Sequence, residues 1–489
     1  MDDDLPYEGV KVLDLSQGIA GPYCAMHFAR NGADVVKLEP PGSGCWSRQL
    51  GKPVGDQTAH SVTVHRGKRS LAVDLKSAAG LEIAKRLAAK CNILVQNYRV
   101  GKLKKFGLDY DSVFKMNPKI IYVAVTGFGQ VGPRRDQPAT DSVMQAYTGM
   151  MSINRDVNGL PQRINMLAID FSAGLYAFQA AASALYGQAV KGKGKLIETS
   201  LLEAAMVFQE AAIIESYLQD GKPEPIGMPV GSFRTKDGFM SINARRDSQF
   251  KSFCTLIGRE EWINDCRFIG PRERVANHEI LMSQIRPIIE TKTSDEWNEL
   301  LSDADILNAK VHTHMDLLND PQVQAAKAIH WVKNDTLGNI PMASIPGQPI
   351  PIVDDNLSHS PHVGEHNQEV LTELGYSSTD IKNLKNKGIS ARKPEGLANS
   401  DWVLIDVNEI IIHIFRPEVR EFYKLEQMWE IPILKENKID NSGTHLQLGL
   451  RFKILVIDSH LNFRYNMTED VYKGEESFTE LQFKLGMAF

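Results

Sequence analysis

Between residues 10 and 125, short runs rich in β-branched residues alternate with segments of helical periodicity. The strand-like runs are 10–15, 34–38, 71–75, 93–96 and 120–125, and helical patterns at 23–31 and 78–90 stand between them. Strands that alternate with helices pair in parallel, so the pattern predicts an α/β fold with a doubly wound parallel sheet. Ligands of such sheets bind at the carboxyl ends of the strands, and the loops after these runs are therefore the candidate site.

Three of these loops carry small or cationic side chains. The first run is followed by the small residues of 16–22, the third by Lys76, and the fourth by Asn97 and Arg99 with a lysine-rich segment behind them. Small residues let a ligand approach the backbone, and arginine and lysine contact phosphate oxygens. Together the loops suit a polyphosphate, although a single cation of this kind is more often a solvated surface charge.

A glycine pattern after the last run, Gly127-Phe-Gly-Gln-Val-Gly132, has the spacing of a dinucleotide-binding fingerprint. That fingerprint must open a helix, and here Pro133 and Pro138 follow closely. The sequence therefore argues against a nicotinamide or flavin site.

The stretch 164–189 brings one carboxylate to the start of a helix. Apolar residues lead to Asp170, and the Ala-rich segment after it repeats apolar side chains at helical spacing. Free N–H groups and the macrodipole at a helix N-terminus favour an ionised carboxylate, so Asp170 is a usable nucleophile. The alternative is an ordinary N-cap, the commoner role of an Asp before a helix. Asp141 starts another helical segment and is a plausible cap as well.

Beyond this segment the chain changes character. A strand at 196–199 and a long apolar helix at 201–217 lead to a Gly/Pro-rich stretch at 221–231, which is typical of a linker or mobile loop. A second, smaller domain with mixed strand and helix patterns is expected at 234–318. Two helices at 364–387 are expected to complete the globular unit.

The composition is that of an ordinary globular protein. The 489 residues are 43% hydrophobic and 24% charged, enough for several domains and a large core. The net charge of −5 gives no reason to expect nucleic-acid or membrane binding. The N-terminus has no signal-peptide pattern and no run reaches the roughly 18 apolar residues of a membrane span, so we expect a cytoplasmic protein. The five cysteines form no C-x-x-C pair, which argues against disulfides and zinc.

Several short motifs follow one another along residues 5–390: Val12-Leu-Asp-Leu15, Ala20-Gly-Pro22, Lys68-Arg-Ser-Leu71, Asn97-Tyr-Arg99 and Gly364-Glu-His-Asn367. In combination they resemble the class III CoA-transferases, the family of the formyl-CoA and carnitine CoA-transferases. The resemblance implies a large Rossmann-like domain at 1–222, a smaller α+β domain at 223–325 and a return to the large domain at 326–390. It also implies an interlocked homodimer.

The same resemblance implies roles for individual residues. It makes Asp170 the catalytic nucleophile, with Asp141 and Gln145 in support, and it implies no metal and no cofactor beyond the CoA thioester. It places along the bound CoA the residues Ile19, Ala20, Val73, Asp74, Leu75, Lys76, Asn97, Tyr98, Arg99 and Lys105. Two positions depart from the family: Pro40 replaces a residue that can carry a cation, and Cys45 stands where an aspartate is frequent.

The chemistry expected from this resemblance is CoA transfer between carboxylic acids. A carboxylate attacks a thioester to give a mixed anhydride, and the expelled CoA thiolate attacks back to leave an aspartyl-CoA thioester. An acceptor carboxylate then takes the CoA by the reverse steps. The segment 227–231 is a candidate lid over these intermediates, with a plain surface linker as the alternative. Succinyl-CoA, a small dicarboxylate and a carnitine-like acid all stay open as substrates.

The family also includes α-methylacyl-CoA racemases, which place a histidine just before the position of Asp141. Here that position is Thr140, which cannot act as an acid or base near neutral pH. Removing and returning an α-proton needs two acid–base groups, so the sequence favours a transferase over a racemase.

The C-terminal segment has a different character. The ranges 402–406 and 409–415 suggest a hairpin and 418–429 a helix, whereas 431–489 shows no consistent pattern. Residues 391–430 resemble the C-terminal half of the Iojap-type ribosomal silencing factors, through Asp401-Trp-Val-Leu-Ile-Asp406 and the residues that follow. The resemblance implies the large ribosomal subunit as a partner, and a ribosome-associated regulator is the alternative function from another class. A bifunctional protein and an accidental fusion of reading frames stay open as origins.

Overall fold

The computed structural model describes residues 5–156, 158–348, 357–388, 402–407, 410–415, 454–458 and 463–465. The chain divides into two compact units, Met1–Asn367 and Gln368–Phe489, and the division falls earlier than the residue 390 expected from the sequence. Among the described residues, no helix is both long and apolar enough to cross a membrane.

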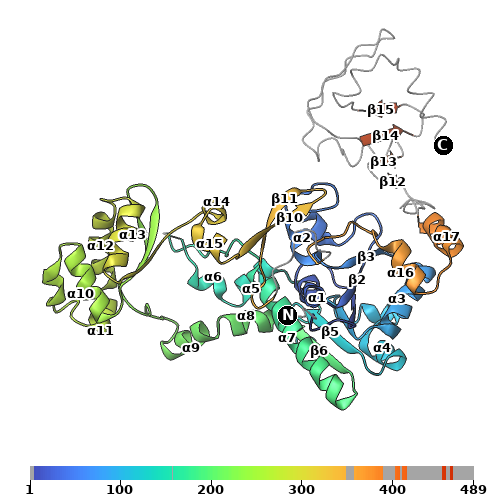
Figure 1. Ribbon diagram of the computed structural model, residues 1–489, viewed down its shortest axis with the longest axis horizontal. Helices are drawn as coiled ribbons and strands as arrows, with labels where there is room; N and C mark the ends of the chain where they lie inside the picture. Colours follow the sequence, from blue (N-terminus) through green and yellow to red (C-terminus); the bar gives the residue numbers. More distant parts are fainter. Residues whose placement is uncertain are drawn as a thin grey trace, which may run out of the picture. The chain divides into compact units, whose positions relative to one another are not determined.

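The first unit is built on a six-stranded parallel sheet, which confirms the predicted α/β class (Figure 1). The strands are β1 (Lys11–Asp14), β2 (Asp34–Glu39), β3 (Arg69–Ala72), β4 (Ile93–Gln96), β5 (Ile121–Thr126) and β6 (Lys195–Ser200). They lie in the order β3-β2-β1-β4-β5-β6. The order reverses between β1 and β4, so the loops after these two strands flank the crevice in which doubly wound sheets bind ligands.

The third strand differs from its predicted range of 71–75, because β3 ends at Ala72. The Asp74 carboxylate accepts the Lys76 N–H at 2.9 Å and the Asp74 carbonyl accepts the Ser77 hydroxyl, which closes a turn. Ser77 then caps α3 (Ala78–Lys90). Residues 74–76 therefore belong to the loop at the carboxyl end of the sheet and not to the strand.

Helices α1 (Ala20–Arg30) and α7 (Ala168–Lys191, the long green helix of Figure 1) pack together on one side of the central strands. The contact is close because α7 presents small residues to α1. A Cβ atom at Gly174 would lie 2.7 Å from the carbonyl oxygen of Ala20. The first turn of α7, which carries Asp170, is thereby held against the first turn of α1.

Two segments predicted as single helices are broken in the structure. Gly149, with a φ of 86°, separates α5 (Asp141–Tyr147) from α6 (Met150–Ile153). Gln209 separates α8 (Leu201–Phe208) from α9 (Glu210–Leu218). In the first case the left-handed conformation, which glycine adopts without strain, ends the helix after two turns. The remaining elements around the sheet are α2 (Ala59–His65), α4 (Tyr110–Met116) and the short 3-10 helices Trp46–Gln49 and Leu103–Phe106.

Residues 230–310 form a separate hydrophobic core around Phe233, Phe253 and Trp297. An antiparallel sheet of β7 (Val230–Arg234), β8 (Phe239–Asn243) and β9 (Leu307–Lys310) lies on one side of this core. Its helices are α10 (Asp247–Leu256), α11 (Pro271–Ala276), α12 (His278–Ile289) and α13 (Ser294–Asp303), with a 3-10 turn at Glu260–Ile263. The predicted Gly/Pro linker of 221–231 is shorter than expected, because Val230 and Gly231 already pair with β8.

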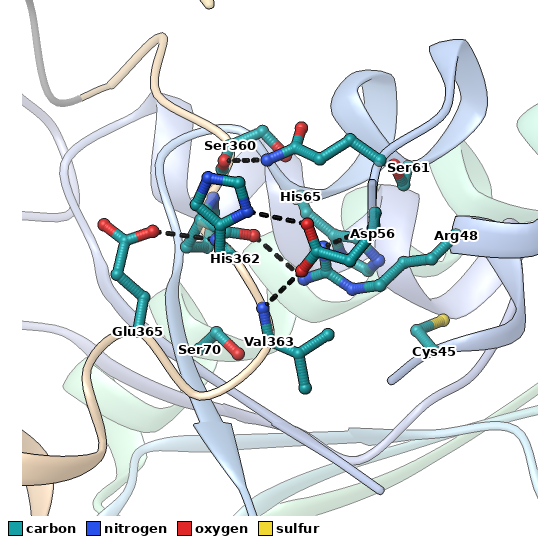
Figure 2. Close-up of polar contacts among 12 residues, drawn as sticks. Cys45, Arg48, Asp56, Ser61, His65, Ser70, Ser360, His362, Val363 and Glu365 are labelled. Atoms are coloured by element: carbon teal, nitrogen blue, oxygen red, sulfur yellow. Dashed lines mark hydrogen bonds and ion pairs between the residues drawn. The ribbon is translucent and has the colours of Figure 1, made fainter. Parts of the chain in front are cut away.

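The chain then passes through α14 (His314–Leu318), α15 (Pro321–Ala325) and the hairpin of β10 (Ile329–Asn334) and β11 (Gly338–Ala343). Residues 357–367 return to the edge of the parallel sheet. Gly364 donates its N–H to Ser70 of β3, and the Asn367 side chain accepts the N–H of Ala72. His362 lies against Asp56, with the ring nitrogen 2.6 Å from the carboxylate (Figure 2).

The second unit contains α16 (Asn367–Glu373), which begins at the last residue of the first unit, and α17 (Ser378–Gly388), in agreement with the two predicted helices. The predicted hairpin is confirmed as β12 (Trp402–Val407) and β13 (Ile410–Phe415). Two short strands, β14 (Ile454–Asp458) and β15 (Phe463–Tyr465), complete this sheet and were not anticipated by any sequence pattern. The predicted helix at 418–429 lies outside the described residues.

Candidate active site

Asp170 is the third residue of α7, which begins at Ala168. The prediction of a helix N-terminus at this place is confirmed. The alternative of an N-cap is wrong, because Leu167 occupies the cap and its side chain bonds no backbone group of the helix. The N–H groups of the first turn must therefore find an acceptor elsewhere.

That acceptor is the carboxylate of Asp141, the first residue of α5. Its Oδ2 atom accepts the N–H of Ile169 at 2.7 Å and the N–H of Asp170 at 3.1 Å. Asp141 is buried, at 3% exposure. The Asp141 carboxylate on α5 therefore caps α7, and the two aspartates singled out in the sequence lie side by side.

This arrangement changes the acidity of Asp170. Burial, and then the negative charge of Asp141, raise the pKa of Asp170 from 3.8 to about 7. The sequence argument expected the N-terminal N–H groups to favour the ionised form of Asp170. That direction is wrong, because burial and the charge of Asp141 raise the pKa, and the N–H groups of Ile169 and Asp170 bond Asp141. Within the described residues, no hydrogen-bond donor to the Asp170 carboxylate is recorded. Near neutral pH the group is therefore a mixture of the carboxylic acid and the carboxylate.

Gln145, one turn after Asp141 on α5, is hydrogen-bonded to the Asp141 carboxylate. Its Nε2 atom donates to Asp141 Oδ1 at 2.6 Å, and its Oε1 atom accepts the N–H of Ile164 at 2.8 Å. Gln145 is 1% exposed. The structure therefore brings together all three residues of the predicted catalytic and supporting set.

The loop after β1 and the loop after β4 are joined at the predicted CoA site. Asn97 Oδ1 accepts the N–H of Gln17 at 2.7 Å, and Asn97 Nδ2 donates to the Gln17 carbonyl at 2.6 Å. Ile19 and Ala20 follow directly, and both side chains are buried. Their side chains contribute to the core, so these two residues offer a ligand their backbone.

The other predicted CoA residues differ in exposure. Asp74, Lys76, Arg99 and Lys105 are exposed, whereas Val73 is buried. Leu75 and Tyr98 are half-buried. All ten predicted residues lie in the loops that follow β1, β3 and β4 or in the first turns after them. The loop after β3 is separated from that after β1 by one strand, β2.

A fully buried ion cluster lies behind the β1 loop. Lys68 Nζ donates to Asp14 Oδ2 at 2.8 Å and to the carbonyl of Pro22 at 2.7 Å. Lys37 lies 3.5 Å from Asp14 Oδ1 and donates to the carbonyl of Ser16. Burial alone would raise the pKa of Asp14, but the two lysines outweigh it and lower that pKa. The two lysines thus bind the segment 16–22 at both of its ends, through the carbonyl groups of Ser16 and Pro22.

The two departures from the family occupy different environments. Pro40 is exposed, whereas Cys45 is buried, and its Sγ atom accepts the N–H of Gly18 at 3.1 Å. Arg48, three residues after Cys45, donates two hydrogen bonds of 2.9 and 2.8 Å to the Glu39 carboxylate. Its side chain is 2% exposed (Figure 2). Arg48 is therefore a structural arginine in this chain.

One site residue went unnoticed in the sequence. The Nε2 atom of Gln17 is buried and has no hydrogen-bond partner in the described part of the chain. An orphaned amide donor in the loop that flanks the crevice is a candidate contact for a ligand oxygen. The small residues around it marked the loop in the sequence, but a single glutamine carries no signal of its own.

Two further predictions concern Thr140 and the candidate lid. Thr140 is the N-cap of α5, and its hydroxyl lies 3.3 Å from that of Ser142. In the lid segment 227–231, the Met228 carbonyl accepts a bond from buried Arg274 and the Pro229 carbonyl accepts the N–H of Ala244. Residues 228–231 of this segment are thus bound to the small domain, since Val230 and Gly231 also pair with β8.

Comparison with known proteins agrees with this geometry. Residues 7–367 match the family described as "CoA-transferase family III", and residues 375–449 match a second family, "Ribosomal silencing factor during starvation". Both resemblances noted in the sequence are therefore confirmed. The chain is 31% identical to the succinyl-CoA:glutarate CoA-transferase of Homo sapiens over 401 residues, which cover 80% of this chain and 91% of that protein.

Two other relatives give the same result. The acetyl-CoA:oxalate CoA-transferase of Acetobacter aceti is 30% identical over 354 residues, covering 71% of this chain and 89% of that one. The crystal structure of a CAIB/BAIF family protein from Brucella suis superimposes with a TM-score of 0.67 at 30% identity, covering 76% of this chain and 100% of the other. With its parallel sheet, its paired aspartates and these relatives, the chain belongs to the CoA-transferase family III and is a CoA-transferase.

Proposed function

We propose that this CoA-transferase moves CoA between small dicarboxylic acids through a covalent intermediate on Asp170. The observation that carries the proposal is the state of the Asp170 carboxylate, which has a pKa raised to about 7 and lies at the start of α7 beside Asp141. The relatives named for succinyl-CoA with glutarate and for acetyl-CoA with oxalate support a dicarboxylate as the acceptor.

The proposed reaction has four steps on one carboxylate. Ionised Asp170 attacks the thioester carbonyl of the donor, which forms an aspartyl–acyl anhydride and expels the CoA thiolate. The thiolate attacks the aspartyl carbonyl, which leaves an aspartyl-CoA thioester and releases the donor acid. The acceptor carboxylate attacks that thioester and expels the thiolate again. The thiolate then attacks the acceptor carbonyl, and Asp170 returns as a carboxylate.

We place CoA along the loops after β1, β3 and β4. The segment 16–22 offers backbone groups at the start of α1, and Asn97 locks it against the β4 loop. Exposed Lys76, Arg99 and Lys105 supply positive charge for the phosphates. The expelled thiolate must stay bound between steps, and contacts to the distal parts of CoA provide that retention.

The test is intact-protein mass spectrometry after incubation with succinyl-CoA, glutaryl-CoA, oxalyl-CoA and a carnitine thioester in turn. The wild-type protein should gain an adduct that hydroxylamine converts to a hydroxamate on the peptide containing Asp170. Asp170→Asn should bind CoA and show no adduct. A wild-type protein that transfers CoA without any hydroxylamine-sensitive adduct would exclude the covalent route.

We also propose that the protein works as a homodimer. Helix α9 is apolar, yet none of its residues is buried. Ile214, Tyr217 and Leu218 are 51%, 83% and 69% exposed, and Val207 and Phe208 at the end of α8 add to the same surface. A monomer in water rarely leaves an apolar surface of this kind uncovered. In the proposed homodimer, the same surface of a second copy covers it.

Light scattering of the purified protein should give the mass of two chains. The double substitution Ile214→Asp and Tyr217→Asp should shift it to one chain, since two carboxylates cannot be buried in an apolar interface without a large cost. Val131→Asp is the matched control, because Val131 is equally exposed at 81% but lies in a loop apart from α8 and α9. A wild-type monomer would refute the dimer.

A further inference from the structure

Gln145 makes more contacts than a simple helix side chain needs. It is fully buried on α5, and its amide reaches Asp141 on its own helix and two carbonyl groups on the segment before α7. The Nε2 atom donates to Asp141 Oδ1 at 2.6 Å and lies 3.3 Å from the carbonyl oxygens of Ile164 and Met166. The Oε1 atom accepts the Ile164 N–H at 2.8 Å.

These bonds connect Gln145 to the reacting group in two ways. The first goes through Asp141, whose second oxygen accepts the N–H groups of Ile169 and Asp170. The second goes through the backbone, because Ile164 and Met166 lead directly into the first turn of α7. Gln145 therefore orients the capping carboxylate of Asp141 and also fixes the backbone that leads into α7. Both effects determine the position of Asp170 in the first turn of the helix.

The bond to Asp141 also fixes the orientation of that carboxylate. An amide N–H is a donor, and a carboxylate oxygen accepts it. With Nε2 on one oxygen and two backbone N–H groups on the other, Asp141 accepts from three donors. These bonds hold both of its oxygens in the orientation that caps α7.

We propose that Gln145 is a positioning residue for CoA transfer: it holds the Asp141 carboxylate turned onto the start of α7, and so fixes Asp170 for attack on the thioester. This inference rests on the proposed function of Asp170. It assigns Gln145 no contact with substrate, and its effect is exerted through Asp141.

Two titratable groups near this turn, Tyr23 and His27, are neutral at pH 7. On α1, which packs against α7, Tyr23 contacts Phe171 and His27 contacts Phe178. Burial raises the pKa of Tyr23, and burial together with Arg66 and Lys68 lowers that of His27 to about 4. Asp141 is therefore the recorded charge that acts on Asp170 among the described residues.

The experiment is a double-mutant cycle on the rate of adduct formation in a single turnover. Gln145→Met keeps the volume and removes the amide, and should slow the acylation of Asp170 about 10- to 100-fold, the size expected when a reacting group is misplaced by about 1 Å. Affinity for CoA should be unchanged, because the hydrogen bonds of Gln145 go to Asp141, Ile164 and Met166 and not to the loops after β1 and β4 within the described residues. In an Asp141→Asn background the same substitution should cost less than 3-fold.

Gln209→Met is the matched control. Gln209 is buried at 8% exposure, and its amide donates to the Thr148 carbonyl at the end of α5 at 3.0 Å, without touching a carboxylate. It should lower the melting temperature as Gln145→Met does and leave the acylation rate of folded protein within 2-fold of wild type.

Gln145→Glu supplies a second, pH-dependent signature. Its protonated carboxyl can donate to Asp141, and its ionised form repels Asp141, so its rate relative to wild type should rise as the pH falls from 8 to 6. Equal costs of Gln145→Met in both backgrounds, or a relative rate of Gln145→Glu that does not change with pH, would overturn the inference. A wild-type protein that forms no adduct would instead overturn the proposed function.

Discussion

Asp170→Asn is expected to abolish CoA transfer and, at the same time, to stabilise the folded protein at pH 8. Loss of the nucleophile removes the covalent route, so the transfer rate should fall at least about 10⁴-fold. The amide keeps the shape of the side chain, and the segment 16–22 and Asn97 stay intact, so CoA should still bind. Transfer assays and calorimetry with CoA measure the two effects separately.

The gain in stability follows from the raised pKa of Asp170. The folded protein holds this proton up to about pH 7, whereas the unfolded chain releases it near pH 3.8. The folded state therefore binds more protons between these values, and the free energy of unfolding falls as the pH rises from about 4 to 7. The asparagine variant lacks this loss. Since one pKa unit corresponds to about 1.4 kcal/mol, we expect it to be roughly 2–4 kcal/mol more stable at pH 8 and indistinguishable at pH 4.

Urea unfolding of both proteins at pH 5, 6, 7 and 8 tests this result. Asp136→Asn is the control, because Asp136 is exposed and pairs with neighbouring Arg135 at the surface. It should change the free energy of unfolding by about 0.5 kcal/mol or less at every pH. A difference between Asp170→Asn and wild type that is independent of pH would show that Asp170 is solvated and has an ordinary acidity.

The sheet could be predicted from the sequence because its signal is local. Alternating strand and helix patterns in 10–125 anticipated five parallel strands, and the apolar side chains at helical spacing after Asp170 anticipated the helix α7. The end of the third strand was misplaced. It lies at Ala72, because the side chain of Asp74 closes a turn there, and the apolar residues Val73 and Leu75 hid that turn in the sequence.

The acidity of Asp170 could not be predicted in this way. Its direction depends first on burial and then on the charge of Asp141, which lies on another helix and accepts the first N–H groups of α7 from a position 28 residues before Ile169. The macrodipole rule applied to Asp170 alone gives the opposite sign. The polar partner of a helix terminus is a tertiary contact, and no periodicity within the helix reveals it.

The buried ions did leave a signal in the sequence. Lys37 and Glu39 alternate with apolar residues in the buried part of β2, which lies next to the centre of the sheet, and Asp14 ends the central strand β1. A charged residue in a run buried on both faces must find a counterion, since an unpaired buried charge costs several kcal/mol. That rule predicts a buried ion cluster, although pairing Asp14 with Lys68, 54 residues later, needs the structure.

The charge balance of this cluster makes its three members unequal. Within the described residues, Asp14 is the carboxylate that pairs with both Lys37 and Lys68, and all three side chains are fully buried. Glu39, which pairs with Arg48, also acts on Lys37 at longer range. Asp14→Asn leaves two buried ammonium groups facing a neutral amide, whereas Lys68→Met leaves a balanced pair of Asp14 and Lys37. Removing the shared partner of a buried pair costs about 3–5 kcal/mol, so Asp14→Asn should lower the free energy of unfolding by that amount at pH 7, and Lys68→Met by clearly less.

The pH dependence of the difference tests the cause. Burial lowers the pKa of Lys68, and Asp14 opposes that effect, so without Asp14 the ammonium group should lose its proton more easily. The cost of Asp14→Asn should then be smaller at pH 9.5 than at pH 7, because a neutral amine no longer repels Lys37. Urea unfolding measures it, with Glu82→Gln as the control, since Glu82 pairs with Arg86 on the exposed surface of α3 at 2.9 Å and should cost about 0.5 kcal/mol or less. Equal costs of Asp14→Asn and Lys68→Met would mean that packing, and not charge balance, determines the stability behind the β1 loop.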